Sequence, residues 1–186
     1  MDLQKIINNW NIKCDISIIL NMWNESHRYY HNLDHLNDIL EMIENDKSLY
    51  TEKEFEKLII TAIFHDCVYD PLRTDNEEKS AYFFEKCCTL KDSDINHIIN
   101  MILETKNHKS NSKLSESFIN YDMSIVNEDY DRLLYWEHGI YNEYKSYGND
   151  YKKGRLLFLE SLLNNPKYID NTENLLKLID YVKKEY

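Results

Sequence analysis

Three stretches of this sequence carry side chains that are suited to holding a metal ion. His31 and His35 lie in the first, His65 and Asp66 are adjacent in the second, and Asp122 lies in the third. Imidazole and carboxylate ligands together suit first-row transition metals. The adjacent pair follows directly on a mostly apolar run, where two titratable side chains at the inner end of a buried helix would be costly without partners. A divalent ion is a natural partner for such a pair.

Each of these signals also has an ordinary explanation. Two histidines four residues apart share one face of a helix and can address one pocket, but they could also be two separate surface residues. Asp122 has mostly apolar neighbours. An acidic residue in that setting is a metal ligand or a helix cap, and the cap is the more frequent of the two. One stretch alone does not separate these interpretations.

Amphipathic helices would have to position these side chains. Apolar residues recur at three- and four-residue spacing almost throughout the chain, which predicts helices. A capping box of Thr51 and Glu54 marks the start of one helix, and Ser93 marks the start of another. Two stretches, 67–74 and 106–117, are expected to be loops. The predicted helices span residues 2–10, 14–26, 33–45, 52–66, 75–88, 93–106, 128–146, 150–163 and 172–185.

The composition excludes several other classes of protein. With Gly 3 and Pro 2 the chain has too few turn formers for a sheet architecture. We therefore predict an all-α fold, a single-domain helical bundle over residues 1–186. A net charge of −11 opposes general nucleic-acid binding and binding to anionic membranes. The chain shows no bilayer-spanning run, no secretory signal and no CxxC spacing among its four cysteines, so we expect reduced thiols and a cytoplasmic location.

Longer motifs surround the candidate ligands. The chain reads Arg-Tyr-Tyr-His-Asn-Leu-Asp-His at 28–35, His-Asp-Cys-Val-Tyr-Asp at 65–70, Asp-Asn-Glu-Glu-Lys-Ser-Ala at 75–81, Thr-Lys-Asn-His at 105–108, Asp-Met-Ser-Ile at 122–125, Glu-Tyr at 143–144 and Gly-Arg at 154–155. In this order the motifs resemble the HD superfamily of metal-dependent phosphohydrolases. The match is closest to a small group described as predicted HD superfamily phosphohydrolases. It covers about residues 28–163 and implies a helical bundle of the HD-domain type.

Two positions depart from the pattern of that group. Asn120 stands where the first Asp of an Asp-x-Asp motif is expected, which would alter only the surroundings of the ligands. Tyr141 replaces an arginine expected just before Glu143, which removes a positive charge that would help to hold substrate. The ligand positions themselves are kept, so the departures do not indicate an inactive protein.

The resemblance implies a metal held by four residues: His35, His65, Asp66 and Asp122. The string Tyr-His-Asn-x-x-His is also similar to the metal site of cyclic-nucleotide phosphodiesterases, which are more distant helical relatives. There the second histidine binds metal and the first protonates the leaving oxygen, which implies His35 as a ligand and His31 as general acid. A histidine one turn from the metal can reach the leaving group without joining the coordination sphere.

The same resemblance gives Asp66 a catalytic role, in which it orients the attacking water. The site would hold one or two divalent ions (Mn, Fe, Co, Zn or Mg), and a second ion would recruit Glu77 or His108. Positive partners for the substrate are also expected near the ligands. The candidates are Arg28, Arg73, Lys106, His108 and Lys109. The ordinary alternatives are a structural arginine at 28 and a solvated loop around the lysines.

The function hypothesis is hydrolysis of a phosphate ester, of a nucleotide or a similar small substrate, through metal-activated water. Phosphomonoesterase and phosphodiesterase activities both fit it. Two alternatives stay open. Some proteins with this helical metal cage are di-iron oxygenases, and a module that binds metal and nucleotide without turnover would explain the missing arginine at Tyr141.

Overall fold

The computed structural model describes residues 1–164, 167, 169–170 and 172–186. Helices make up 73% of the structure, and no strand occurs among the described residues. The prediction of an all-α fold is therefore confirmed. In the same part of the chain, no helix combines the length and the apolarity needed to cross a membrane.

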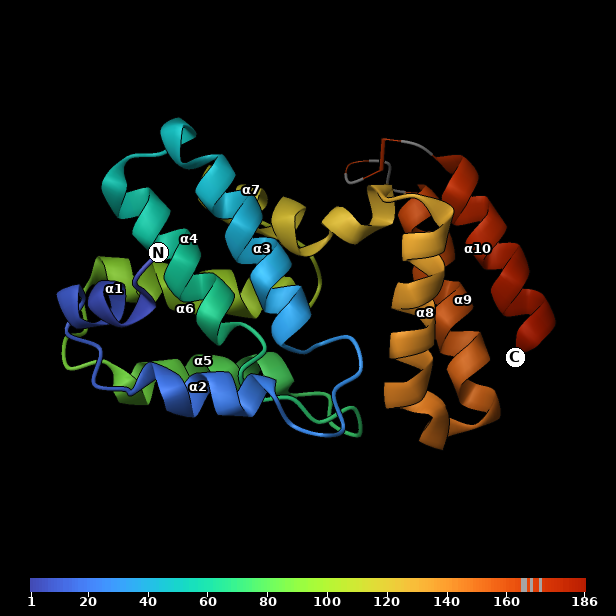
Figure 1. Cartoon of the computed structure of the whole chain (residues 1–186), viewed down its shortest axis with the longest axis horizontal. Helices are drawn as coiled ribbons and strands as arrows, with labels where there is room; N and C mark the ends of the chain where they lie inside the picture. Colours follow the sequence, from blue (N-terminus) through green and yellow to red (C-terminus); the bar gives the residue numbers. More distant parts are fainter. Residues whose placement is uncertain (165–166, 168, 171) are drawn as a thin grey trace. The chain divides into compact units, whose positions relative to one another are not determined.

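Contacts divide the chain into two compact units, Met1–Asp122 and Met123–Tyr186 (Figure 1). All four predicted metal ligands lie in the first unit, and Asp122 is its last residue. The prediction of one domain over the whole chain stays a prediction.

The first unit contains seven α-helices, with α4 in contact with most of the others. They are α1 (Leu3–Asn9), α2 (Ile16–Trp23), α3 (Leu33–Asn45), α4 (Glu52–Phe64), α5 (Asn76–Cys87), α6 (Ser93–Thr105) and α7 (Lys113–Asp122), with the short 3-10 helix η1 (Lys47–Leu49) after α3. Helix α4 contacts α1, α3, α5, α6 and α7. Its side chains from 58 to 64 are completely buried, as expected for a helix that is apolar on every side. The C-terminal end of α4, next to two of the predicted ligands, therefore lies in the interior of the first unit.

The start of α4 is confirmed as predicted, and its end comes earlier. The backbone N–H of Glu54 donates to Thr51 Oγ1 at 3.3 Å, and the backbone N–H of Thr51 donates to Glu54 Oε2 at 3.0 Å. The helix ends at Phe64 rather than at residue 66. His65 is its C-cap and Asp66 lies in the following turn, so both side chains are carried by the helix terminus.

The expectation of a loop over residues 106–117 is wrong for its last part, because α7 begins at Lys113. Leu114 and Phe118 lie one turn apart and are buried, so the helix has an apolar face despite its serine-rich sequence. Ser112 caps the helix, since its Oγ accepts a hydrogen bond from the backbone N–H of Ser115 at 3.1 Å. The predicted cap at Ser93 is also shifted, since Asp92 accepts from the backbone N–H groups of residues 94 and 95.

The described residues of the second unit form three long helices and two short ones. They are η2 (Ser124–Asn127), α8 (Tyr130–Tyr144), η3 (Lys145–Tyr147), α9 (Asn149–Asn164) and α10 (Thr172–Glu185). Apolar side chains of α8, α9 and α10, including Leu133, Leu159 and Leu178, are fully buried. Glu137 is buried among them. Tyr141, which departs from the pattern of the resembling group, also lies in this unit. Its ring stacks on that of Tyr186, with 4.2 Å between centroids.

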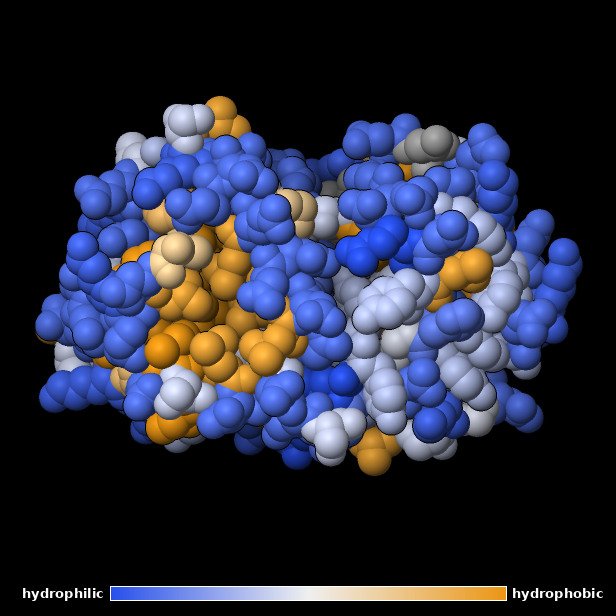
Figure 2. Space-filling model, viewed as in Figure 1, coloured by the Kyte–Doolittle hydropathy of each residue, from blue (hydrophilic) through white to orange (hydrophobic). Residues whose placement is uncertain are grey.

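The face of the molecule shown in Figure 2 is mostly hydrophilic, in keeping with the acidic composition. Apolar side chains gather on one face of the first unit, where α2, α3 and α4 lie in the same view.

All four cysteines are free, as expected for reduced thiols. Burial raises the pKa of the Cys67 thiol to about 12, so this side chain stays protonated at neutral pH.

Candidate metal centre

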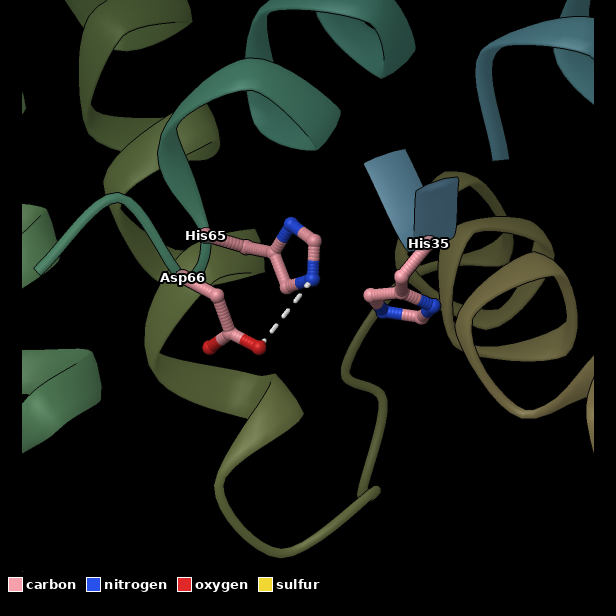
Figure 3. A group of neighbouring side chains, drawn as sticks. All are labelled: His35, His65 and Asp66. Carbon is pink, nitrogen blue, oxygen red and sulfur yellow. Dashed lines mark ion pairs between the residues drawn. The ribbon is translucent and has the colours of Figure 1, made fainter. Parts of the chain in front are cut away.

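Three predicted ligands meet where the ends of α3 and α4 approach each other. His35 lies in the first turn of α3, and His65 and Asp66 follow the last residue of α4. Ligand atoms of these three side chains all lie within 4.8 Å of one another (Figure 3). His65 Nε2 is 3.6 Å from Asp66 Oδ2. The spacing matches a group that could hold one ion.

Asp122 joins this group from the end of α7. Its Oδ1 lies 3.1 Å from His35 Nε2 and 3.5 Å from His65 Nε2. Burial raises the pKa of Asp122, but the hydrogen bond from His35 and the nearby charges of the His35 and His65 rings outweigh it and hold this pKa well below its usual value. The carboxylate is therefore ionised at neutral pH. All four predicted ligands come together, and the helix that carries Asp122 is the one that the sequence pattern missed.

The hydrogen bonds of His65 show which of its nitrogens faces the cluster. Its Nδ1 donates to the carbonyl oxygen of Ala62 at 2.9 Å, so in the neutral ring the lone pair is on Nε2. Nε2 is buried and has no hydrogen-bond partner among the described residues. A metal-ligating histidine commonly binds with one nitrogen while the other donates to a backbone carbonyl. The donor set and this unpartnered nitrogen fit a divalent transition-metal ion.

The negative charges around His65 also favour the binding of a cation. Burial lowers the pKa of His65, but the negative charges of Asp66 and Asp122 outweigh it and raise the pKa to about 9. Neither carboxylate pairs with an arginine or a lysine in the described part of the chain. A proton or a metal ion is thus the available partner for their charge.

His31 lies beside the cluster, in a turn that precedes α3. The chain at 30–32 is a turn, and α3 begins at Leu33 after Asn32, whose side chain accepts from the backbone N–H of residue 34 at 2.9 Å. The His31 ring centroid is 6.0 Å from that of His35. It also stacks on Tyr69, with 4.5 Å between centroids. The two histidines are neighbours because of this turn rather than because of a shared helical face.

The expectation that Arg28 contacts substrate is not supported by its geometry. Its side chain is 0% exposed. The guanidinium donates to the carbonyl oxygens of His31, Asp66 and Cys67 and to the carboxylate of Glu25. With its donors directed into the protein, Arg28 has no exposed group to offer a substrate.

The other expected substrate-binding cations are engaged or lie elsewhere. Arg73 makes two hydrogen bonds of 2.7 Å with Asp75. Lys106 donates to Glu78 at 2.6 Å. Lys109 is exposed and lines a hollow of about 420 Å³ that contains none of the predicted metal ligands. Its other lining residues are Asn100, Leu103, Glu104, Asn107 and Asn111.

His108 and Glu77 border the cluster. His108 Nε2 lies 4.0 Å from Asp122 Oδ2, and the backbone of His108 is in the left-handed region at φ 50°. Partial burial raises the pKa of Glu77, and the charge of Asp66 raises it further. Each of these side chains is therefore close enough to interact with one carboxylate of the cluster.

Two aromatic residues that the sequence did not single out support the ligands. Trp23 is fully buried, and its Nε1 donates to the carbonyl oxygen of Ile63 at 2.9 Å. Its ring lies 5.3 Å from that of His65, and the Phe118 ring lies at the same distance. Both belong to the apolar helical pattern, which does not distinguish residues that support a site from other core residues.

Comparisons of the chain with protein-family models, with curated proteins and with solved structures found no match. Support for a function therefore comes from the residues of the cluster and from the ordered motifs.

Proposed function

We propose that this protein is a metal-dependent phosphohydrolase of the HD type, which cleaves a phosphate ester of a nucleotide or a similar small substrate. The observation that carries the proposal is the unpartnered Nε2 of His65, buried between two carboxylates and beside His35. A buried nitrogen without a hydrogen-bond partner is unfavourable unless it binds a ligand. Two imidazoles with two carboxylates are a suitable donor set for such an ion.

In this proposal His35, His65, Asp66 and Asp122 hold the metal. A bound divalent ion lowers the pKa of a coordinated water and neutralises charge on the phosphoryl group. Asp66 is partly exposed, with 14% of its side chain accessible, so it can orient an attacking water by accepting its hydrogen bond. The remaining ligands fix the position at which the phosphorus atom would be attacked.

His31 is the proposed general acid. Its ring lies next to that of a ligand, His35, and is itself only partly buried. Stacking on Tyr69 limits the orientations of the ring. A protonated imidazole held in this way can donate a proton to the leaving oxygen of the ester.

Metal analysis of the purified protein, followed by titration with Co(II), tests the proposal. We expect one or two equivalents of metal and loss of binding in His65→Ala. His138→Ala is the matched control, because His138 lies in the second unit and bonds to Tyr181. A metal-loaded protein should then hydrolyse at least one member of a panel of nucleotides and simple phosphate esters, assayed with Mn, Fe, Co, Zn and Mg.

Three results would overturn the proposal. Protein that binds no metal, or binds it equally well in His65→Ala, would remove the centre itself. Oxygen-dependent turnover by the iron form would identify an oxygenase. Metal-loaded protein that binds nucleotide but hydrolyses nothing in the panel would identify a binding module.

A further inference from the structure

The guanidinium of Arg28 joins two segments whose relative position matters for the proposed reaction. Its Nη1 donates to the carbonyl oxygen of His31 at 3.0 Å and to that of Asp66 at 2.8 Å. Its Nη2 donates to the carbonyl oxygen of Cys67 at 3.0 Å. One rigid group therefore contacts the turn that carries the proposed general acid and the turn that carries two ligands.

These carbonyl groups need a donor from outside their own segment. Asp66 and Cys67 lie in the turn directly after α4 and its C-cap, so their carbonyl groups are outside the helical hydrogen-bond pattern and accept from Arg28 instead. A cation at the C-terminus of a helix is also favoured by the helix dipole. Arg28 supplies both the donors and the charge from a position 38 residues away in the sequence from Asp66.

The arginine is itself fixed from several sides. Glu25 accepts from its Nε at 3.0 Å and balances its charge. The guanidinium carbon lies 5.5 Å from the centre of the Trp23 ring and 5.1 Å from that of Tyr69. Tyr69 is the residue on which His31 stacks. The planar group is thus held between the ring that supports the end of α4 and the ring that supports the general acid.

We propose that Arg28 is a positioning residue, which sets the place of His31 relative to the His65–Asp66 turn. The inference rests on the proposed function, since it concerns the geometry of the same centre. A lysine would keep the charge, but its single ammonium group cannot reproduce the planar, multi-donor arrangement of arginine. Arg28→Lys therefore separates the geometric role from a merely electrostatic one.

The test measures Co(II) binding and the visible Co(II) spectrum of the full-length protein. In Arg28→Lys we expect the Co(II) affinity to fall by about 10- to 100-fold, the usual effect of residues that hold ligands from outside the coordination sphere. The ligand-field bands should shift, because Asp66 would no longer be held in place. Arg132→Lys is the matched control, since Arg132 is an exposed arginine of the second unit, and both readouts should stay as in the wild type.

A second measurement concerns the proposed acid. Displacing His31 should slow cleavage of an alkyl phosphate ester more than that of a nitrophenyl ester, whose leaving group needs no proton. A wild-type protein that binds no Co(II) would overturn the proposed function and this inference together. If the wild type binds Co(II) while Arg28→Lys shows unchanged affinity, spectrum and leaving-group dependence, only the positioning role is overturned.

Should Arg28→Lys fail to fold, Glu25→Ala takes its place. Glu25 is 43% exposed, so its removal spares the core while it releases one side of the guanidinium. We expect a loss of Co(II) affinity of about fivefold, the effect of one lost hydrogen bond. Unchanged affinity and spectrum in this variant would contradict the inference.

Discussion

The two units each bury a cluster of ionisable side chains, and the clusters differ in how their charge is balanced. In the second unit Glu137 is completely buried, and it accepts from Arg155 Nε at 2.7 Å and from the Tyr151 hydroxyl at 2.5 Å. In the first unit the described ion pairs of Asp66 and Asp122 are all with histidines. The first cluster therefore has an excess of negative charge that the second does not have.

This difference distinguishes a structural cluster from a candidate binding site. A buried charge is tolerated when its partner is supplied by the chain, as Arg155 is for Glu137. One nitrogen of Arg155, Nη2, has no hydrogen-bond partner in the part that the structure describes. Its guanidinium nevertheless has a counter-ion, and its carbon lies 4.1 Å from the centre of the Trp136 ring. Among the described residues, no arginine or lysine pairs with the carboxylates around His65, which favours a cation from outside the chain.

The largest expected effect follows from removing a ligand of the first cluster. Asp122→Ala should abolish turnover and lower the metal affinity by well over about 100-fold, because even partners outside the coordination sphere are worth about 10- to 100-fold. Metal content after dialysis and phosphoester hydrolysis measure the two effects. Asn120→Ala is the control, since Asn120 is an exposed residue of the same helix. Full metal occupancy in Asp122→Ala would remove Asp122 from the ligand set.

The next effect distinguishes the proposed acid from the ligands. His31→Gln should keep the metal and the fold while turnover of an alkyl ester falls by about 10²- to 10⁴-fold, as is usual for a lost proton donor. The loss should be much smaller for a nitrophenyl ester. His27→Gln is the control, because His27 bonds to the Tyr69 carbonyl and its side chain is 44% exposed. Equal losses on both esters would assign His31 to substrate positioning instead.

A substitution in the second cluster should lower the stability of the protein and leave its metal binding unchanged. Glu137→Gln leaves the buried charge of Arg155 without its counter-ion, which is expected to lower the free energy of unfolding by about 3–5 kcal/mol. Chemical denaturation measures the loss, and the Co(II) affinity of the folded variant should stay as in the wild type. Asp131→Asn, an exposed change on the same helix, should stay within about 0.5 kcal/mol. A normal stability for Glu137→Gln would mean that the second cluster is not structurally required.

The sequence predicted those features that depend on neighbouring residues. The capping box of Thr51 and Glu54 and the burial of α4 are local consequences of residue type and apolar spacing. Helix α7 was missed because serine and lysine residues hide an apolar face formed by residues such as Phe118. The helix predicted over 33–45 has these bounds in the structure, and because Asn32 caps it, His31 lies in the preceding turn and does not share a helical face with His35.

The ligands of the centre were identified by motif order, and their common location comes from the structure. Nothing local to Asp122 shows that it meets His35, which is 87 residues away. The role of Arg28 could not be predicted either, since it depends on carbonyl groups that only the folded chain brings within reach. Sequence patterns thus gave the types of side chain at the candidate centre, while tertiary contacts decide which of them meet in the cluster and which hold the backbone.

The smallest expected effect concerns the metal-free protein and tests whether a proton takes the place of the missing cation. The pKa of His65 is raised to about 9 in the folded protein, against 6.5 for an ordinary histidine. A raised pKa contributes stability that is fully present below pH 6.5 and is lost as the pH rises through about 9. In the presence of a chelator the free energy of unfolding should therefore fall by up to about 3 kcal/mol between these two values.

A saturating divalent metal should remove much of this pH dependence, because a ligating imidazole binds in its neutral form and the ion replaces the proton. Asp122→Asn supplies the internal control, since it deletes one of the two carboxylates that raise the pKa of His65 and should shrink the fall in the chelated protein. Denaturant titrations at a series of pH values measure all three curves. If the stability of the chelated wild type is flat across this window, the two carboxylates do not hold a proton on His65. The contrast between the two clusters would then need another explanation.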